Sequence, residues 1–415
     1  MNISKQTECR ICHGELRDVL DLGIIYRSSF VKEDEVNHED EKAPLVLSKC
    51  TDCGLTQLRD TIDLDVMYKE QYWYSSALNK SMISSLKDVV NDIESKIELQ
   101  DDDTVLDIGC NDGTLLQLYS KDVFKVGFDP APNLNKPECF FINDYFTAID
   151  YEIAVKTRNL KPKVITAIAM FYDLPDPNRF VQDVKIILHE KGIFIIQFTD
   201  LLSMFKLTAF DNICHEHLEY YRLYDVLRLL RKHGMDVVDV SYNDVNGGSI
   251  RITACHDGAY IPRPSVVSCL TKEREYLNTY GFTNFSVAIE KVKNTVTTWL
   301  KLDKDNKNKV LLLGASTKGN TLLQVCEITN EQIPYAAEVN KDKFGLKTLG
   351  SNIKIVSEEE AFAMKPDYFF CPVWHFEKNL LTKKPIIDYI EQGGKLVFPL
   401  PTFHIVGKEE LNDGR

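Results

Sequence analysis

The stretch that decides the fold is Val105-Leu106-Asp107-Ile108-Gly109-Cys110-Asn111-Asp112-Gly113-Thr114-Leu115-Leu116. A short apolar run, an acidic residue, a glycine-bounded turn and a second apolar run are typical of a strand, a tight loop and a helix. Gly109 and Gly113 let the backbone approach a ligand closely and adopt dihedral angles that other residues resist. The stretch therefore predicts a ligand-binding loop at the end of a strand.

A second strand follows and ends at Asp129, 22 residues after Asp107. At this interval a nucleotide-binding βαβ unit places a carboxylate on ribose hydroxyls. The G-x-x-x-G spacing is not the dinucleotide fingerprint, and the Walker lysine with its serine or threonine is missing. A purely structural turn is the alternative, but the position of Asp129 favours a small adenosine ligand. The pattern resembles motif I and its acidic partner in class I S-adenosylmethionine (SAM) methyltransferases.

The composition limits the classes of partner. With 415 residues the chain is long enough for two or three domains, each with a sizeable core. Its net charge of −13 disfavours nucleic acid or an anionic membrane as the principal partner. We see no signal peptide and no run of about 18 apolar residues, so a cytoplasmic protein is expected. A phosphate-bearing substrate would need a local basic pocket.

Residues 1–70 are expected to form a small zinc-binding domain. Of the 11 cysteines, four are paired in sequence as two CxxC motifs. Two such pairs in a cytoplasmic chain favour one tetrahedral zinc ion, with a reduced pair of redox motifs as the alternative. Four thiolates leave no open position on the metal, so the zinc is expected to be structural, and His13 is not needed as a ligand. The predicted ligands are Cys9, Cys12, Cys50 and Cys53.

Residues 71–255 are expected to form a doubly wound, Rossmann-like α/β domain. Apolar strand patterns alternate with helical ones, and the last two strands are predicted to close the sheet as an antiparallel hairpin. In such a sheet the ligand lies at the carboxyl ends of the strands. The residues predicted to bind the cofactor SAM are Asp107, Gly109, Asn111, Asp129, Asn143, Asp144 and Met170.

An aromatic cluster, Tyr72-Trp73-Tyr74, precedes the amphipathic helix predicted from about Lys80 to Leu99. Aromatic side chains before a helix usually pack against the core. These could instead line the mouth of the substrate site, where a tyrosine hydroxyl supplies a polar contact. Both interpretations stay open at this point.

Residues 256–415 are expected to contain a helical connector and then a C-terminal α/β domain. Val310-Leu311-Leu312-Leu313-Gly314-Ala315-Ser316-Thr317-Lys318-Gly319-Asn320-Thr321 repeats the pattern of strand, glycine loop and helix. Backbone amides at a helix start, together with Lys318, would suit a diphosphate, although a plain αβ turn is the alternative. Two such loops in one chain indicate two nucleotide-bearing ligands.

The segment Phe210-Asp211-Asn212-Ile213-Cys214-His215-Glu216-His217-Leu218-Glu219-Tyr220-Tyr221 is the candidate for chemistry. Its two histidines are two positions apart and cannot share a helix face, which disfavours a second metal site. A histidine beside a glutamate can move protons near neutral pH. The alternative is a solvated polar helix start.

Together these motifs resemble one family over nearly the whole chain, from Cys9 to about His404. The order of CxxC pairs, LDIGCNDGTLL, HEH, NGGSIR and GASTKGNT resembles the deoxysugar C-methyltransferases. The resemblance implies a zinc domain, a SAM domain and a C-terminal α/β domain that enclose a nucleotide-linked 4-keto-6-deoxyhexose, commonly methylated at C-3. It also implies that His217 is the general base, with Glu216 beside it.

Two positions depart from that family. Members that methylate C-3 tend to carry an aromatic residue where Cys214 stands and a histidine near Asp173. These departures leave the base in place. They bear on the identity of the sugar, the methylated carbon and the partners that move protons.

The expected chemistry fits the residue types. A carbon beside a ketone becomes a nucleophile when a positioned base removes its proton and the enolate oxygen is stabilised. His217 would take the proton, and Tyr74, Asn212 or Tyr221 could donate to the oxygen. An O-methyltransferase, or a non-catalytic SAM-binding scaffold, are the rival interpretations. The residues predicted to bind the substrate are Tyr72, Asn212, Tyr221, Lys318, Asn320 and Trp374.

Overall fold

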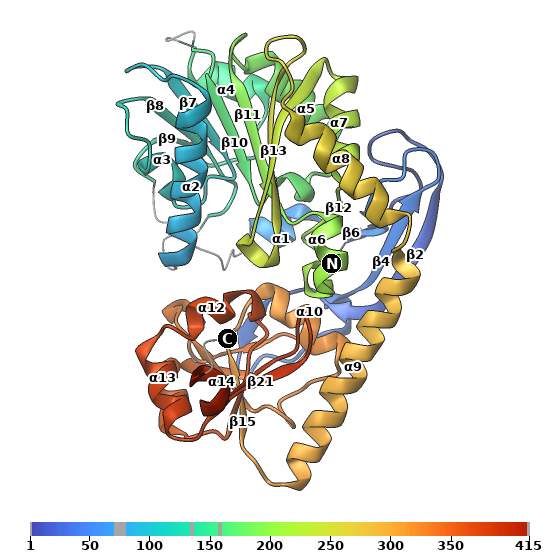
Figure 1. Ribbon diagram of the computed structural model, residues 1–415, viewed down its shortest axis with the longest axis vertical. Coiled ribbons are helices and arrows are strands. Elements are labelled where there is room, and N and C mark those ends of the chain that lie inside the picture. The colour runs from blue at the N-terminus through green and yellow to red at the C-terminus, as the bar shows by residue number, and fades with distance from the viewer. Residues whose placement is uncertain (1, 70–79, 133–136, 157–159, 413–415) are drawn as a thin grey trace.

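The computed structural model describes residues 2–69, 80–132, 137–156 and 160–412. Its central sheet has seven strands in the order β13-β14-β11-β10-β7-β8-β9 (Figure 1). The strands from β9 to β11 are parallel, and β14 and β13 close the sheet as an antiparallel hairpin, as the sequence predicted. The strands are β7 (Thr104–Ile108), β8 (Phe124–Phe128), β9 (Phe140–Ile142), β10 (Val164–Ile168), β11 (Ile193–Phe198), β13 (Met235–Asn243) and β14 (Ser249–His256).

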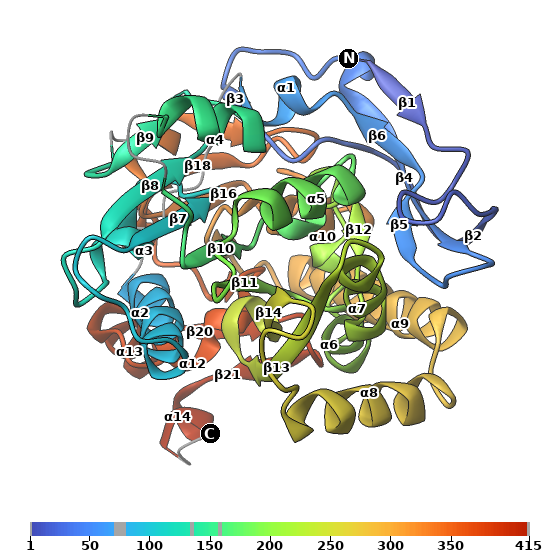
Figure 2. The same cartoon turned by 90° about the horizontal axis from the view of Figure 1, so that it is seen from above.

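Helices cover both faces of this sheet (Figure 2). Strand residues alternate between the two faces, so Val105 joins a core with α2, whereas Leu106 joins a separate core with α4, α5 and α7. Burial on both faces explains why β7 and β11 are buried at every position and mostly apolar. The helices are α2 (Lys80–Lys96), α3 (Thr114–Gln117), α4 (Ala148–Ala154), α5 (Pro177–Ile187), α6 (Leu201–Leu207) and α7 (Leu223–Lys232).

A second sheet of eight strands lies below the first, in the order β21-β20-β19-β15-β16-β18-β17-β3. The long helices α8 (Pro264–Leu277) and α9 (Phe282–Asp305) connect the two sheets, as the sequence predicted for this region. The strands are β15 (Val310–Leu313), β16 (Tyr335–Glu338), β17 (Leu346–Thr348), β18 (Lys354–Ser357), β19 (Tyr368–Phe370), β20 (Lys395–Phe398) and β21 (His404–Val406), with β3 (Phe30–Lys32) at one edge.

The remaining helices of this half surround that second sheet. They are α10 (Thr317–Val325), α11 (Glu358–Ala363), α12 (Glu377–Leu380), α13 (Lys384–Glu391) and α14 (Lys408–Asn412). Among the described residues, none of the helices is both long enough and apolar enough to cross a membrane.

The N-terminal residues give one strand to the eight-stranded sheet, and their own four-stranded sheet, in the order β12-β5-β4-β2, takes one strand from the segment after β11. They form β1 (Ile3–Lys5), β2 (Leu16–Tyr26), β4 (Lys42–Cys50), β5 (Thr56–Leu58), β6 (Asp60–Ile62) and α1 (Leu64–Tyr68). Here β3 pairs with β17 of the eight-stranded sheet, while β12 (Glu219–Tyr220) pairs with β5. The division into residues 1–70, 71–255 and 256–415 stays a prediction, and these exchanged strands cross it.

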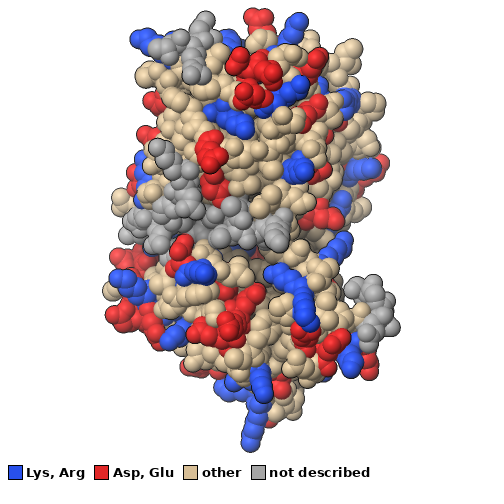
Figure 3. All heavy atoms as spheres, turned by 90° about the vertical axis from the view of Figure 1, so that its left-hand side faces the viewer, with Lys and Arg blue, Asp and Glu red and all other residues tan. Residues whose placement is uncertain are grey.

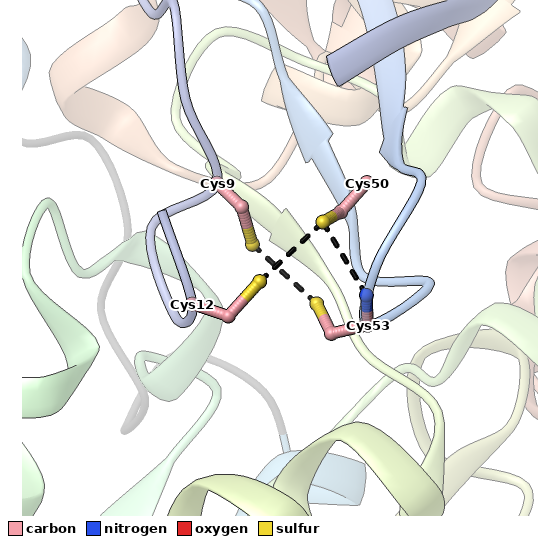
Figure 4. A group of neighbouring side chains, drawn as sticks. All are labelled: Cys9, Cys12, Cys50 and Cys53. Atoms are coloured by element: carbon pink, nitrogen blue, oxygen red, sulfur yellow. Dashed lines mark hydrogen bonds between the residues drawn. The ribbon is translucent and has the colours of Figure 1, made fainter. Parts of the chain in front are cut away.

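The four paired cysteines converge at the end of β4 (Figure 4). The Sγ atoms of Cys9 and Cys53 are 3.5 Å apart, as are those of Cys12 and Cys50. A disulfide would bring two sulfurs to about 2.05 Å, so these are separate thiols. Zinc–sulfur bonds of about 2.3 Å in a tetrahedron would place the four sulfur atoms at nearly this spacing from one another. The cluster therefore fits one structural zinc ion.

This cysteine cluster is attached directly to the HEH segment. Leu58 of β5 donates its backbone N–H to the carbonyl oxygen of Leu218 at 2.8 Å. Arg10, inside the first CxxC motif, donates to the carbonyl oxygen of Leu58 at 3.0 Å and lies 3.5 Å from Glu219. His13, by contrast, faces Glu8 on the surface and points to no metal role.

We predict one zinc ion per chain, measurable by elemental analysis of the purified protein. Because zinc binding and folding are coupled, Cys50→Ser should lose the metal and melt at a lower temperature. It should also lose turnover, since the cysteine cluster is attached to the segment beside His217. Cys139→Ser, which changes a cysteine outside the cluster, is the matched control. Protein without zinc, or a folded Cys50→Ser variant with unaltered activity, would refute the site.

Candidate active site

A cavity of about 690 Å³ lies between the two sheets. The parallel strands β7, β8 and β10 of the upper sheet and β15 and β16 of the lower sheet all end at its wall. Ligands bind at the carboxyl ends of strands in open α/β sheets, and here two such edges face each other. The cavity therefore reaches both glycine loops.

Charged side chains of both signs are interspersed on the face shown in Figure 3, with acidic groups gathered on its lower half. The described part of this face has no continuous basic surface. The basic groups that would meet a diphosphate are instead found inside the cavity, whose wall includes Arg179, Lys318, Lys343 and Lys383.

The upper wall is the half predicted to bind SAM. Asp129 follows β8 and accepts hydrogen bonds from the backbone N–H of Asn111 and of Ala131, each at 2.9 Å. These bonds fix the carboxylate beside the glycine loop. Burial nevertheless raises the pKa of Asp129, because the carboxylate has lost contact with water. Hydroxyl groups of a ligand could replace that lost hydrogen bonding.

The glycine loop allows its own backbone to come close to a bound ligand. Gly109 has a φ of +74°, and a Cβ atom there would lie 3.0 Å from the side chain of Met170. Asp107 accepts a hydrogen bond of 2.5 Å from Thr166, while burial raises its pKa to about 7. The predicted cofactor residues in the cavity wall here are Asp107, Gly109, Asn111, Asp144 and Met170.

Asn143 supports this half from behind. Its side-chain amide donates to the carbonyl oxygens of Asp129 at 2.8 Å and of Ala131 at 3.0 Å. It is absent from the cavity wall. Asn143 therefore orients the loop that carries Asp129, in place of the direct contact with SAM that the sequence suggested.

In the lower wall, as in the upper one, an acidic residue at the end of a strand is hydrogen-bonded to the backbone of a glycine loop, and here the acid is Glu338. This residue ends β16 and accepts a hydrogen bond from the backbone N–H of Ala315 at 3.2 Å. Lys343 donates to the carbonyl oxygen of Ala315 at 2.8 Å and lies 3.6 Å from Glu338. Both side chains line the cavity, and the sequence analysis missed both. An acidic residue at the end of the strand after a glycine loop was the available signal.

The two histidines of the HEH segment point to different places. The Nε2 atom of His215 lies 3.2 Å from the carbonyl oxygen of Ala43, in the interface with the N-terminal strands. His217 lines the cavity, and its Nδ1 lies 2.7 Å from the carbonyl oxygen of Asn212. A carbonyl oxygen can only accept, so Nδ1 carries the proton and Nε2 of the neutral ring keeps its lone pair.

The surroundings of His217 keep the ring neutral. Its ring centroid lies 4.1 Å from that of Tyr172. Burial, and next the charge of Lys318, lower the pKa of His217 to about 3. Burial raises the pKa of the neighbouring Glu216 to about 7, and the two side chains approach within 4.8 Å. A neutral imidazole beside an acid of near-neutral pKa can accept a proton from a substrate.

Further titratable groups surround this end of the cavity. Asp173 and His375 line it, and each has a side-chain atom without a hydrogen-bond partner among the described residues. Burial raises the pKa of Asp173 well above its usual range and lowers that of His375 to about 3. The sequence places Tyr172 and Asp173 at the carboxyl end of a strand, where a ligand is expected, but it assigned Tyr172 no role and missed His375. Aromatic and histidine side chains in short loops carry no local signal of this role.

Four of the predicted substrate residues lie behind the wall. Asn212 positions His217 through its carbonyl oxygen, and Trp374 donates to a carboxylate oxygen of Asp211 at 2.9 Å. Asn320 donates to the carbonyl oxygen of Ser29 at 3.1 Å, and Tyr221 is fully buried in the core. None of the four is part of the described cavity wall. Tyr72 and Tyr74 fall outside the described residues.

For the cofactor we predict that Asp129→Ala weakens SAM binding roughly ten-fold to over a hundred-fold. Loss of a charge-assisted hydrogen-bond pair costs about 1.5–3 kcal/mol, and about 1.4 kcal/mol is a factor of ten in affinity. Isothermal titration calorimetry measures the change. Asp150→Ala, a surface change on α4, is the control, and wild-type affinity in the Asp129 variant would exclude that residue from the site.

Comparison with known proteins supports this architecture. Three family models match the chain in order: a zinc-binding domain over residues 9–68, a methyltransferase domain over residues 78–240 and a C-methyltransferase C-terminal domain over residues 244–401. Magnesium protoporphyrin IX methyltransferase of Synechocystis, solved with bound SAM, is 12% identical, with 42% of this chain and 79% of that chain covered and a TM-score of 0.31.

A second solved structure, 1,6-didemethyltoxoflavin-N1-methyltransferase of Burkholderia thailandensis, is 11% identical, with 50% of this chain and 97% of that chain covered and a TM-score of 0.32. The chain is 30% identical over 413 residues to the C-methyltransferase NovU of Streptomyces niveus, and 97% of each chain is covered. Because that likeness runs over nearly the whole of both chains, the chain belongs to the SAM-dependent C-methyltransferase family that its motif order predicted.

Proposed function

We propose that this enzyme methylates a carbon of a nucleotide-diphosphate-linked 4-keto-6-deoxy sugar, with C-3 as the expected position. The observation that carries the proposal is one cavity that reaches His217 and both glycine loops. The upper loop suits SAM, and the lower loop and its basic neighbours suit a sugar nucleotide. The likeness to NovU supports transfer to carbon.

His217 begins the reaction as general base. Its Nε2 accepts the proton from the carbon beside the ketone, while Nδ1 stays bonded to the carbonyl oxygen of Asn212. The C–H electron pair becomes the carbon–carbon double bond of an enolate. When bound, SAM would supply the electrophilic methyl group for this carbon and would leave as S-adenosylhomocysteine. The proton remains on His217 until solvent removes it.

Glu216 is assigned to support the base. As a carboxylate it stabilises the imidazolium ion that forms on His217, or it accepts a hydrogen bond from a sugar hydroxyl. The enclosed site strengthens both interactions because water screens them poorly there. The family resemblance leads one to expect a histidine near Asp173, and the neighbouring sequence has none, so we expect different partners for the proton beyond His217 in this chain.

Product analysis tests the substrate class. The purified enzyme is incubated with SAM and a panel of nucleotide-linked 4-keto-6-deoxyhexoses, and the products are examined by mass spectrometry and NMR. A mass gain of one methylene group, located on carbon, is expected. Methyl on oxygen would indicate an O-methyltransferase, and SAM binding without any turnover would indicate a scaffold.

We predict that His217→Asn binds both ligands within a few-fold of wild type and loses about 10²–10⁴ in turnover, the usual contribution of a general base. In heavy water with S-adenosylhomocysteine in place of SAM, the wild type should exchange the hydrogen of the reacting carbon for deuterium. The variant should not. If His217→Asn keeps turnover near that of the wild type while Asp173→Asn loses it, His217 is not the general base.

We also predict the pH profile of kcat/KM. His217 has a pKa of about 3 and stays neutral at higher pH, so it causes no inflection near 6.5. Glu216, whose pKa burial raises to about 7, is protonated below that pH and a carboxylate above it. The rate should therefore rise with pH through about 7 and then level off. Glu216→Gln should remove this rise, and a profile unchanged by the substitution would assign the rise to a different group.

A further inference from the structure

Lys318 is a buried lysine whose pKa is lowered by burial, while the charges of nearby acids, among them Asp211, Glu216 and Asp173, favour its protonated form. Its Nζ atom is shielded from solvent and has no hydrogen-bond partner among the described residues. The side chain lies in the first turn of α10 and lines the cavity. An unpartnered ammonium group in such a place costs several kcal/mol of desolvation, which the folded enzyme recovers only if something else contacts it.

Lys343 shows that the chain can satisfy a buried lysine on the same wall. Its Nζ atom donates to the carbonyl oxygen of Ala315 at 2.8 Å, lies 3.6 Å from Glu338 and sits 4.5 Å from the centre of the Phe30 ring. Lys343 therefore holds the loop together. Lys318 has no such structural contact, which leaves its charge available for a bound ligand.

The charge of Lys318 acts at the reacting end of the cavity. It adds to the fall that burial causes in the pKa of the base His217, and it opposes the rise that burial causes in the pKa of Glu216 and Asp173. In the same two ways it adds to the fall in the pKa of His375 and opposes the rise in that of Asp211. The sequence pattern suggested a diphosphate ligand for Lys318, but the structure places its ammonium group among the residues that surround the base.

An enolate needs a positive group near its oxygen. Among the described residues, burial keeps His217 and His375 neutral, and Asp173 and Glu216 are acids. The charge of Arg27 also reaches Glu216, but Arg27 is paired with Glu41 and is not part of the cavity wall. Preorganised charge in a dry site stabilises a developing oxyanion strongly. Resting on the function proposed above, we propose that Lys318 is a catalytic residue whose ammonium group stabilises the enolate oxygen while His217 holds the proton.

The charges balance through the cycle. As His217 takes the proton, the C–H electrons form the new double bond and the carbonyl π electrons move to the oxygen. That oxygen becomes negative beside the ammonium group of Lys318. When the carbon takes the methyl group, the carbonyl bond re-forms and the oxygen is neutral again. Lys318 donates hydrogen bonds throughout and gives up no proton.

Deuterium exchange isolates this role from methyl transfer and from binding. The enzyme is saturated with S-adenosylhomocysteine and thymidine-diphosphate-linked 4-keto-6-deoxyglucose in heavy water, and exchange at the carbon beside the ketone is followed by NMR. Lys318→Met should lower the exchange rate at saturation about 10²–10³-fold, the usual cost of one oxyanion donor. Affinity for both ligands should change only a few-fold. Lys341→Met, which removes an exposed lysine outside the cavity, should exchange like wild type.

Several outcomes would overturn the proposal. Wild-type exchange in Lys318→Met would do so, and so would a raised KM for the sugar nucleotide with unchanged exchange at saturation, which would return Lys318 to the diphosphate. A covalent adduct on Lys318 after borohydride treatment would replace the oxyanion role with an imine. If Lys318→Met does not fold, Lys318→Gln is judged by the same exchange rate. Absence of exchange in wild type that still methylates oxygen would instead overturn the function proposed above.

Discussion

The antiparallel pairing of β12 with β5 fixes the backbone beside His217, the proposed base. Leu218, next to His217, accepts a hydrogen bond from the backbone of Leu58 at 2.8 Å and donates one to the carbonyl oxygen of Tyr172 at 2.7 Å. One bond leads to the cysteine cluster and the other to the carboxyl end of β10. The backbone beside His217 is thus fixed between the zinc-binding unit and the SAM-binding sheet. A metal that takes no part in the chemistry thereby supports the geometry on which the chemistry depends.

Burial gives the fixed groups their reactivity. A histidine in water would be partly protonated near pH 6.5, but inside the cavity His217 stays neutral and keeps the lone pair of Nε2. The same burial makes the ring a weaker base, so it depends on a nearby carboxylate to stabilise the imidazolium ion. The same exclusion of water raises the pKa of Glu216 and leaves Lys318 without solvent. These groups lose hydration in the folded enzyme, so a ligand that contacts them gains more than it would at an exposed surface. Substrate binding and preorganisation are therefore two consequences of one enclosed site.

The features that sequence predicts well are set by neighbours along the chain. The CxxC turns, the glycine loop of Gly109 and the strand order all follow from local patterns, and the structure contains them. Side-chain direction depends instead on pairing between distant segments. Tyr221 packs against Phe171 and Phe198 in the core, and the exchange of β3 and β12 has no signature in their short sequences. For the same reason the sequence overlooked Glu338, although its strand was recognised.

The two departures from the family pattern, Cys214 and Asp173, lie in different places relative to the cavity wall. Cys214 is fully buried and lies behind the cavity wall, so a small side chain there leaves the wall to Glu216 and His217. Asp173 lies on the wall near Tyr68, and one of its carboxyl oxygens has no hydrogen-bond partner among the described residues. An acid so close to the base would oppose formation of an enolate if it were ionised. Burial raises the pKa of Asp173 well above its usual range and so favours the neutral acid, while the charge of Lys318 opposes this rise. In this active site, the balance of charge around His217 therefore matters more than the identity of any one neighbour.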